Sequence, residues 1–400
     1  MTKTNQKIPD GWSVKKLGEI GTFVSGGTPD TEKAEYWNGD IIWLTPSEIT
    51  KLKTRFVSDS ERKITKLGLK NSSAVLLPKN SLIICTRATI GDCCINTKEV
   101  STNQGFKNLI PNNNCTDFLY YLISIHKSDL IRRACGSTFL EISKHDIEKL
   151  KYVFPPLAEQ KKIAEILSCW DEGIEKLSAL IEKKKIQKKA LMQQLLTGKH
   201  RLKGFATPWH EVKLGDILHE NNERITMQNQ HTVLSVTKNG ICSQSEYFDK
   251  QIASENNIGY KILHKYNVVF SPMNLWMGSL GFSEYDVGIV SPAYKIFTIN
   301  PQYGAFSFLK YFMICPKMIN LYAVNSEMGA SVVRRNLDLQ SLLSSKIVIP
   351  DLAEQKAIAE ILSKADEEIE LLNKKLEAFK LEKKALMQKL LTGKIRVKGM

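Results

Sequence analysis

The sequence LAEQKKIAEILS runs from Leu157 to Ser168, and LAEQKAIAEILS, which differs in one letter, runs from Leu352 to Ser363. The match continues on both sides. Residues Pro155–Gly204 align with Pro350–Gly399 without a gap at a constant offset of 195, and 33 of the 50 positions are identical. Chance does not produce such a match, so the chain contains an internal duplication. The long dissimilar stretch between the copies excludes a solenoid of short contiguous repeats.

Weaker repeats lie outside the two copies. WSVKKLGEI at residues 12–20 matches WHEVKLGDI at 209–217, and FLYYLISIHK from Phe118 matches FLKYFMICPK from Phe308, in the same order. Each half of the chain therefore combines a globular domain of shared topology with a nearly invariant tail. The predicted boundaries are a first globular domain (1–154), a central helical region (155–204), a second globular domain (205–349) and a C-terminal helical region (350–400).

Each copy of the repeat is predicted to form one long helix, because its apolar residues step by three and four over several heptads. The helices follow Pro156 and Pro350, and we expect them to end before Gly198 and Gly393, where glycine adopts the left-handed closing conformation. About forty residues at ~1.5 Å each give a rod of roughly 60 Å. Lysines interrupt both apolar seams. The seam residues are Leu167, Trp170, Ile174, Leu177, Ile181, Leu191 and Leu195 in the first copy, and Leu362, Ala365, Ile369, Leu372, Leu376, Phe379, Leu386 and Leu390 in the second.

A single helix of this pattern would expose its seam, and the matching seam of the other copy can cover it. We therefore predict an antiparallel pair within one molecule, which puts the globular domains at opposite ends. The alternatives are two helices each packed on its own domain, a parallel pair and an intermolecular pair. The predicted fold class is α+β: two globular α/β domains separated by two long helices that form an antiparallel coiled coil with pseudo-two-fold symmetry.

The charge balance favours a polyanionic partner. The chain has 56 Lys and Arg residues against 42 Asp and Glu, a formal net charge of +14, which suggests nucleic acid first and an anionic membrane surface second. No stretch approaches the roughly 18 apolar residues of a membrane-spanning helix. The start, MTKTNQKIPDGW, lacks the apolar core of a secretion signal. We expect a cytoplasmic protein whose eight scattered cysteines are buried thiols rather than zinc ligands.

Two similar but non-identical domains on a rigid spacer match the geometry of duplex DNA, whose strands are also related by two-fold axes. Each domain would read one half-site. The rod would fix the number of unread base pairs between the half-sites. Sequence would be read by side chains at base edges, and affinity would come from Lys and Arg on phosphates.

The chain also resembles the specificity (S) subunits of type I restriction-modification systems. The resemblance rests on PPLAEQKKIAEIL (155–167) and PDLAEQKAIAEIL (350–362) with their long helices, on GWSVKKLGEIGTFVSGGTPDTEKAEYWNGDIIWLTPSEI (11–49), and on NLWMGSLGFSEYDVGIVSPAYKIF (274–297). It covers essentially the whole chain and implies two target recognition domains.

The same resemblance implies the partners. Two methyltransferase (M) subunits would bind the helices and domains, and two restriction (R) subunits could join them. S-adenosylmethionine and ATP with Mg would belong to those partners, with no cofactor on this chain, and adenine in a bipartite site would be the methylated base. The chain itself would be a non-catalytic recognition subunit with no metal site.

Candidate DNA-binding residues in the first domain lie near predicted strand ends. The apolar run 81–85 reads as a buried strand that leads to Arg87, which could contact guanine or phosphate, or could pack on the surface. Asn103 and Gln104 could pair with adenine, or could cap a turn. Arg132 and Arg133 could contact phosphate, with helix-surface charge as the alternative.

The second domain repeats this pattern around residues 267–281, where a strand leads into glycines. Asn274 could read adenine. Trp276 is either a core residue or a wedge between bases. Arg334 and Arg335 form the densest positive charge of this domain and could contact phosphate or lie on a helix surface.

Motifs for catalysis are weak. FPPL, at residues 154–157, has lost the polar residue and the aromatic of an amino-methyltransferase motif, and no glycine-rich cofactor loop precedes it. Pro29-Asp30 with Glu61 and Lys63 spells a loose nuclease pattern, but a turn and a solvated charged stretch explain these residues better. The rival functions are a self-sufficient DNA methyltransferase or nuclease, and a two-headed adaptor for an acidic protein.

Overall fold

Both long helices begin and end where the sequence predicts. Helix α6 spans Leu157–Leu195 and helix α12 spans Leu352–Leu390, so each has 39 residues. Gly198 and Gly393, which follow the two helices, have φ angles of +70° and +71°. Glycine tolerates this left-handed conformation, and the helices therefore end at Thr-Gly as expected.

The computed structural model describes residues 8–136, 140–237, 240–244, 256–328 and 335–397. Its contacts divide the chain into two units. Unit 1 contains residues 1–178 and 375–400, and unit 2 contains residues 179–374. Each unit therefore combines one globular domain with parts of both long helices.

The described residues of the first globular domain form three sheets. A five-stranded sheet has the order β2-β9-β6-β7-β4, a three-stranded sheet has the order β5-β3-β8, and β1 pairs with β10. Parallel pairs (β4–β7 and β3–β8) and antiparallel pairs both occur. The strands are β1 (Ser13–Lys16), β2 (Gly21–Ser25), β3 (Trp37–Leu44), β4 (Phe56–Val57), β5 (Arg62–Ile64), β6 (Leu82–Cys85), β7 (Cys93–Asn96), β8 (Val100–Thr102), β9 (Phe106–Pro111) and β10 (Lys151–Phe154), and the short helices are η1 (Leu17–Glu19), η2 (Ala34–Tyr36), α1 (Pro46–Ile49), α2 (Lys66–Lys70), α3 (Thr116–Ile125), α4 (Lys127–Arg133) and α5 (Lys144–Glu148).

Unit 2 has a four-stranded sheet of order β12-β19-β16-β17 and four two-stranded pairs, β11-β22, β13-β14, β15-β18 and β20-β21. Pairing of the first and last strands of the domain repeats the β1–β10 pair of unit 1. The strands are β11 (His210–Lys213), β12 (Leu218–Asn221), β13 (Leu234–Thr237), β14 (Gly240–Ser243), β15 (Lys261–His264), β16 (Val268–Phe270), β17 (Leu280–Phe282), β18 (Val287–Val290), β19 (Lys295–Ile299), β20 (Ser326–Met328), β21 (Arg335–Leu337) and β22 (Lys346–Ile349), and the short helices are α7 (Leu214–Ile217), η3 (Pro272–Met277), α9 (Phe306–Phe312), α10 (Pro316–Val324) and α11 (Leu339–Ser344).

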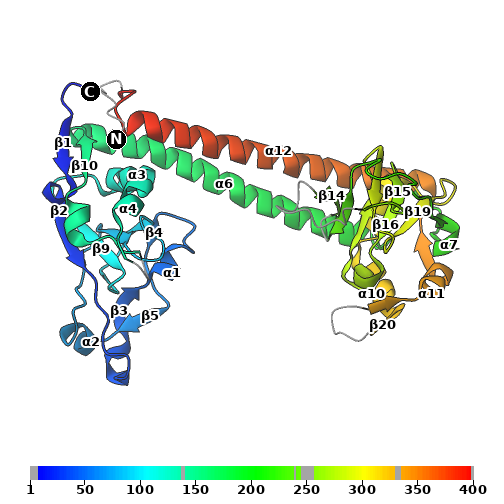
Figure 1. The fold of residues 1–400 in the computed structure, drawn as a ribbon, viewed down its shortest axis with the longest axis horizontal. Coiled ribbons are helices and arrows are strands. Elements are labelled where there is room, and N and C mark those ends of the chain that lie inside the picture. Colours follow the sequence, from blue (N-terminus) through cyan, green and yellow to red (C-terminus); the bar gives the residue numbers. More distant parts are fainter. Residues whose placement is uncertain (1–7, 137–139, 238–239, 245–255, 329–334, 398–400) are drawn as a thin grey trace. The chain divides into compact units, whose positions relative to one another are not determined.

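The main core of each unit includes both long helices. In unit 1, Leu167 of α6 and Leu390 of α12 belong to the same buried cluster as Phe118 and Phe154. In unit 2, Leu195 of α6 and Leu362 of α12 lie in the equivalent cluster. Figure 1 shows the strands of unit 1 gathered at the Leu157 end of α6, close to the C-terminal end of α12. Each domain therefore packs on the start of the helix that follows it and on the end of the other helix.

The helix segments pair antiparallel in each unit. In unit 1, Trp170 of α6 lies 5.5 Å from Phe379 of α12 between ring centroids, and Asp171 forms an ion pair with Lys383. Closer to the start of α6, Glu159 contacts Arg396, which follows α12. Contacting residues therefore have rising numbers along α6 and falling numbers along α12. The ion pairs Lys184–Glu368 and Lys188–Asp366 give the same order in unit 2. The predicted α/β domains and antiparallel long helices are confirmed.

Candidate nucleic-acid interface

The repeated motif contains a buried glutamate that holds the end of the other helix. Glu159 is fully buried and accepts hydrogen bonds from Trp12 Nε1 at 3.0 Å and from Arg396 Nε and Nη2 at 2.7 and 2.8 Å. In unit 2, Glu354 accepts the same bonds from Trp209 Nε1 at 3.1 Å and from the guanidinium of Arg201 at 2.7 Å. A buried carboxylate requires such partners. The repeat therefore encodes the attachment of the helix end to the domain in each unit.

The neighbouring glutamine attaches the helix to a loop of its domain. In unit 1, Gln160 accepts a hydrogen bond from the backbone N–H of Cys115 at 3.0 Å, immediately before α3. In unit 2, Gln355 accepts from the backbone N–H of Ala305 at 2.8 Å, immediately before α9. Both glutamine side chains are almost fully buried. The Glu-Gln pair of the motif thus fixes the position of each domain on its helix.

The lysines that interrupt the seams form ion pairs with the other helix. In unit 1, Lys383 forms an ion pair with Asp171, which also accepts a hydrogen bond from the Tyr121 hydroxyl at 2.5 Å. In unit 2, Lys188 forms an ion pair with Asp366, which accepts from Tyr311 at 2.8 Å, and Lys184 forms an ion pair with Glu368 at 2.7 Å. The lysine stems are largely covered, and their charges are neutralised by the other helix.

Every predicted seam residue is buried or partly buried. Leu167 and Leu362, which occupy matching positions of the repeat, are completely buried. Burial of one leucine contributes about 1.5–3 kcal/mol, so each of the two helps to hold the domain of its unit on the helices.

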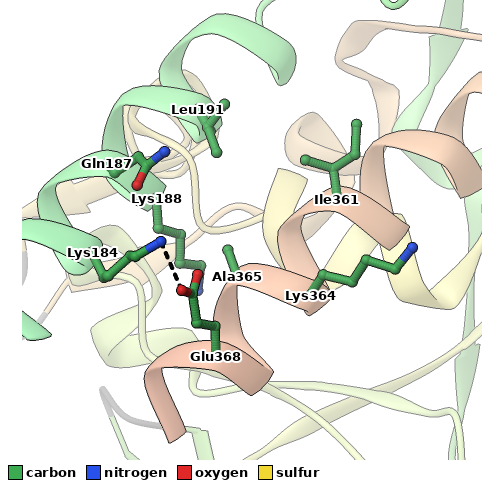
Figure 2. Close-up of a pocket in the computed structure, with 8 residues that line it drawn as sticks. All are labelled: Lys184, Gln187, Lys188, Leu191, Ile361, Lys364, Ala365 and Glu368. Carbon is green, nitrogen blue, oxygen red and sulfur yellow. Dashed lines mark ion pairs between the residues drawn. The ribbon is translucent and has the colours of Figure 1, made fainter. Parts of the chain in front are cut away.

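The two units differ at three matched positions of the helix pair. In unit 1, the rings of Trp170 and Phe379 fill the space between the helices, next to Gly173. The matching positions in unit 2 are Ala365, Lys184 and Glu368, and they line a cavity of about 220 Å³. Figure 2 shows Lys184 reaching from α6 to Glu368 on α12, with the small Ala365 side chain nearby. The cavity therefore exists because unit 2 has small or charged residues where unit 1 has aromatic ones.

We predict that Lys184→Phe, Ala365→Trp and Glu368→Ala together stabilise unit 2 by about 1 kcal/mol, because they fill the cavity with the pair of rings that unit 1 already accommodates. The measurement is the free energy of unfolding in urea, with hydrogen exchange in α6 as the probe. Lys189→Phe, on the exposed face of the same helix, is the control and should give no gain. A triple variant no more stable than the parent chain would contradict the prediction.

The candidates Arg87, Asn103 and Gln104 come from loops that the fold brings together. The backbone N–H of Thr86 donates to the carbonyl of Gly105 at 2.8 Å, and the Thr28 hydroxyl donates to the side chain of Gln104. Three loops, which follow β2, β6 and β8, therefore meet at one edge of the domain. The predicted buried strand before Arg87 is confirmed, because all four residues of β6 are buried.

The side chains of these candidates already have protein partners. Arg87 donates to Glu141 at 2.6 Å, and the same carboxylate lies 3.3 Å from Lys107. Asn103 Oδ1 accepts from the backbone N–H of Gly105 at 2.9 Å, as a turn cap does. Arg87 is 45% exposed and can still present its outer nitrogens. Glu141 holds the guanidinium in place, and no sequence pattern indicated this residue.

Arg132 and Arg133 lie in the last turn of α4. Arg132 forms an ion pair with Asp129 and is 75% exposed. Arg133 is exposed, and the described residues include no acidic partner for it.

In the second domain, Asn274 and Trp276 lie on η3. The guanidinium of Arg335 stacks over the Trp276 ring at 4.4 Å from its centroid. Within the described residues, the buried Trp276 Nε1 and Arg335 Nε have no hydrogen-bond partner. Arg334 lies outside the described residues. The structure therefore joins Trp276 and Arg335 into one cluster.

The residues considered for metal binding have ordinary structural roles. Asp30 accepts a hydrogen bond from the backbone N–H of Glu32 at 3.0 Å and closes a turn, while Glu61 forms an exposed ion pair with Lys51 at 3.1 Å. Among the described residues, no group of three or more His, Cys, Asp and Glu could hold a metal ion. No described helix is long and apolar enough to cross a membrane.

The cysteines lie in surroundings that range from buried to exposed. Burial raises the pKa of Cys85 and of Cys93 to about 12, so these thiols stay protonated at neutral pH. The expectation of buried thiols is wrong for Cys135 and Cys169, which are exposed. Cys169 lies on the solvent side of α6, where the helix pattern calls for a polar residue.

Residues 9–188 and 207–381 match the family model of the type I restriction modification DNA specificity domain. The chain belongs to this family. The two matched regions cover most of the chain and correspond to its two halves, each a domain with its helix. The family match agrees with the resemblance seen in the PxLAEQK segments, because the matched regions contain the segment of each copy of the repeat.

Two relatives from Methanocaldococcus jannaschii illustrate the similarity. The chain is 37% identical to the type I restriction enzyme MjaIX specificity subunit over 188 residues, which are 46% of this chain and 42% of that protein. It is 25% identical to the MjaVIII specificity subunit over 98% of this chain and 95% of that protein. The stronger match thus spans less than half the length of its relative, whereas the weaker one spans nearly all of it.

Solved structures of the family have the same fold. The HsdS subunit from Thermoanaerobacter tengcongensis superposes with a TM-score of 0.55 at 16% identity, covering 99% of this chain and 100% of that chain. At this identity the similarity concerns the fold alone. It covers both domains and both long helices.

Proposed function

We propose that this chain is the DNA-specificity subunit of a type I restriction-modification complex, and that each globular domain reads one half of a bipartite site. The observation that carries the proposal is the matched attachment of two different domains to one helix pair. Glu159 with Arg396 in unit 1 and Glu354 with Arg201 in unit 2 form the same contacts, while the strands and loops of the two domains differ. Identical attachments with different reading surfaces suit an asymmetric bipartite sequence.

The reading surface of the first domain is proposed to be the edge where Arg87, Asn103 and Gln104 meet. Arginine can pair with guanine, and the two amides can pair with adenine. In the second domain, Asn274 and the Trp276–Arg335 cluster take this role. The formal net charge of +14 supports binding to the phosphate backbone.

The helices are proposed to act as a spacer between the two half-sites and as the docking surface for two methyltransferase subunits. The restriction subunits would join this assembly. S-adenosylmethionine and ATP with Mg would be bound by those partners, and this chain would provide recognition without catalysis. The helix pair suits a spacer because its seam charges are neutralised internally, as in the ion pair between Lys188 and Asp366.

The test is a genome-wide map of methylated adenine in cells with and without this chain. We expect a split motif, with methylated adenines on both strands, that disappears when the chain is deleted. Methylation by the purified chain alone, with S-adenosylmethionine, would favour a self-sufficient methyltransferase and overturn the proposal. Tight binding of proteins without any DNA preference would favour the adaptor function.

A further inference from the structure

A cavity of about 630 Å³ in unit 1 has an excess of positive charge, part of it from Arg132 and Arg133, which the sequence already suggested as phosphate contacts. It lies between the last turn of α4 and the start of β10. Four basic side chains and one carboxylate line it, together with a tyrosine. These residues are Arg132, Arg133, Lys149, Lys151, Asp129 and Tyr152.

The second feature of the cavity is the buried hydroxyl of Tyr152. The residue is only 7% exposed, and its Oη has no hydrogen-bond partner among the described residues. The ring of His126 covers one face of Tyr152 at 4.2 Å between centroids. The nearby carboxylate of Asp129 is occupied by His126 Nδ1 at 2.9 Å and by Arg132. A buried donor without an acceptor is costly, which points to an acceptor that binds from outside the chain.

The positive charges are only partly compensated. Asp129 neutralises Arg132, but Arg133, Lys149 and Lys151 have no acidic partner among the described residues. Lys151 also lies directly opposite Lys16 in the β1–β10 pair. Like charges in that position repel each other, and a bound anion would relieve the repulsion.

In the matching strand pair of unit 2, an ion pair neutralises one of the two opposing lysines. There Lys346 lies opposite Lys213, but Lys346 forms an ion pair with Glu211 at 2.9 Å. The position of unit 1 that matches Glu211 is Val14. The excess of charge is therefore a feature of unit 1 and not of the shared fold.

We propose that this cavity is a phosphate-binding site, in which the Tyr152 hydroxyl and the Arg133 guanidinium donate to phosphate oxygens and Lys149 and Lys151 supply charge. A tetrahedral anion accepts hydrogen bonds from several directions, which suits a hydroxyl, a planar guanidinium and two ammonium groups. The phosphate could belong to the DNA backbone, an assignment that rests on the proposed function, or to a free phosphate ester. The walls are charged rather than apolar, so the site recognises the phosphate group and not an attached base.

The first arm of the test measures the unfolding temperature of the full chain in inorganic phosphate and in chloride at equal ionic strength. We expect phosphate to raise it, because a ligand that binds only the folded state stabilises that state. Tyr152→Phe and Arg133→Gln should abolish this rise. Tyr152→Phe should also unfold no earlier than the parent chain in chloride, because it removes a donor that lacks an acceptor. Lys346→Gln is the matched control in unit 2 and should keep the rise.

The second arm distinguishes the sources of phosphate, using the chain in complex with its methyltransferase subunits. If the phosphate belongs to DNA, Arg133→Gln should flatten the dependence of log K on log salt by about one unit. If that slope is unchanged while the phosphate-dependent rise is lost, the ligand is a free phosphate ester.

The proposal is overturned if phosphate gives no rise and Arg133→Gln leaves the salt slope unchanged, or if polyglutamate stabilises the chain and phosphate does not. Failure of the proposed function would give a different experimental result from failure of the phosphate site. The parent complex would then show no sequence-specific DNA binding, and the phosphate arm would still give its own result.

Discussion

Glu159→Ala is expected to lower the free energy of unfolding of unit 1 by about 3 kcal/mol, at the lower end of the range for breaking a buried ion pair. The glutamate is completely buried, whereas its partner Arg396 is 41% exposed. Alanine leaves the indole N–H of Trp12 without its acceptor and releases the chain end that follows α12. The lower end of the range applies because water can solvate the freed arginine.

The measurement is urea unfolding, with hydrogen exchange to localise the loss to β1, β10 and the end of α12. Glu159→Gln is expected to have a smaller effect, because an amide oxygen can still accept from Trp12. Glu354→Ala should produce an equivalent loss in unit 2. The control is Glu165→Ala, whose exposed carboxylate pairs only with Lys162 on the same helix. If Glu159→Ala lowers the free energy of unfolding no more than Glu165→Ala does, Glu159 does not attach the end of α12 to the domain.

Exchange of the first domain is expected to change one half of the methylated motif completely and to leave the other half intact. Residues 17–150 should be replaced by the corresponding segment of a relative with a different specificity. This junction keeps β1, β10 and the contact of Trp12 with Glu159, while the contacts that Cys115 and Tyr121 make with α6 must come from the matching residues of the relative. The loops proposed to read DNA lie inside the exchanged segment, while the helices proposed to set the spacing are unchanged.

The result is read from the map of methylated adenines. Exchange of residues 214–345, the matching segment of unit 2, is the reciprocal control and should change only the other half-site. In both exchanges the number of unread base pairs should stay constant. A change in both half-sites, or in their separation, after a single exchange would contradict independent reading by the two domains.

The long helices could be predicted from sequence because their signals are local. The heptad spacing, the prolines before them and the glycines after them act over a few residues. The partners of the motif could not be predicted in this way. Glu159 and Arg396 are 237 positions apart, and nothing near either residue indicates the other. The repeat itself could have indicated the ion pairs between the helices. At the offset of 195, Asp171 and Lys188 recur as Asp366 and Lys383, at or beside the apolar seams.

For the candidate DNA-binding residues, too, the sequence indicated the local position but not the distant partner. Arg87 was predicted at a strand end, where the structure places it, but its partner Glu141 comes from a distant loop. The unpartnered hydroxyl of Tyr152 had no sequence signal at all, because a tyrosine beside lysines is common on any strand. Its significance depends on which side chains surround it and which acceptors are already occupied.

The sequence by itself determined the duplication, the two helices and the presence of two different α/β domains, because repeats and periodicity are properties of the chain. Only the tertiary structure decided that each domain is held by the end of the other helix, that the seam lysines are neutralised across the helix pair, and that the charges of a basic cavity in unit 1 are only partly compensated by the described residues. These features depend on which distant groups meet and whether their charges and hydrogen bonds are satisfied, and that is settled only when the chain folds.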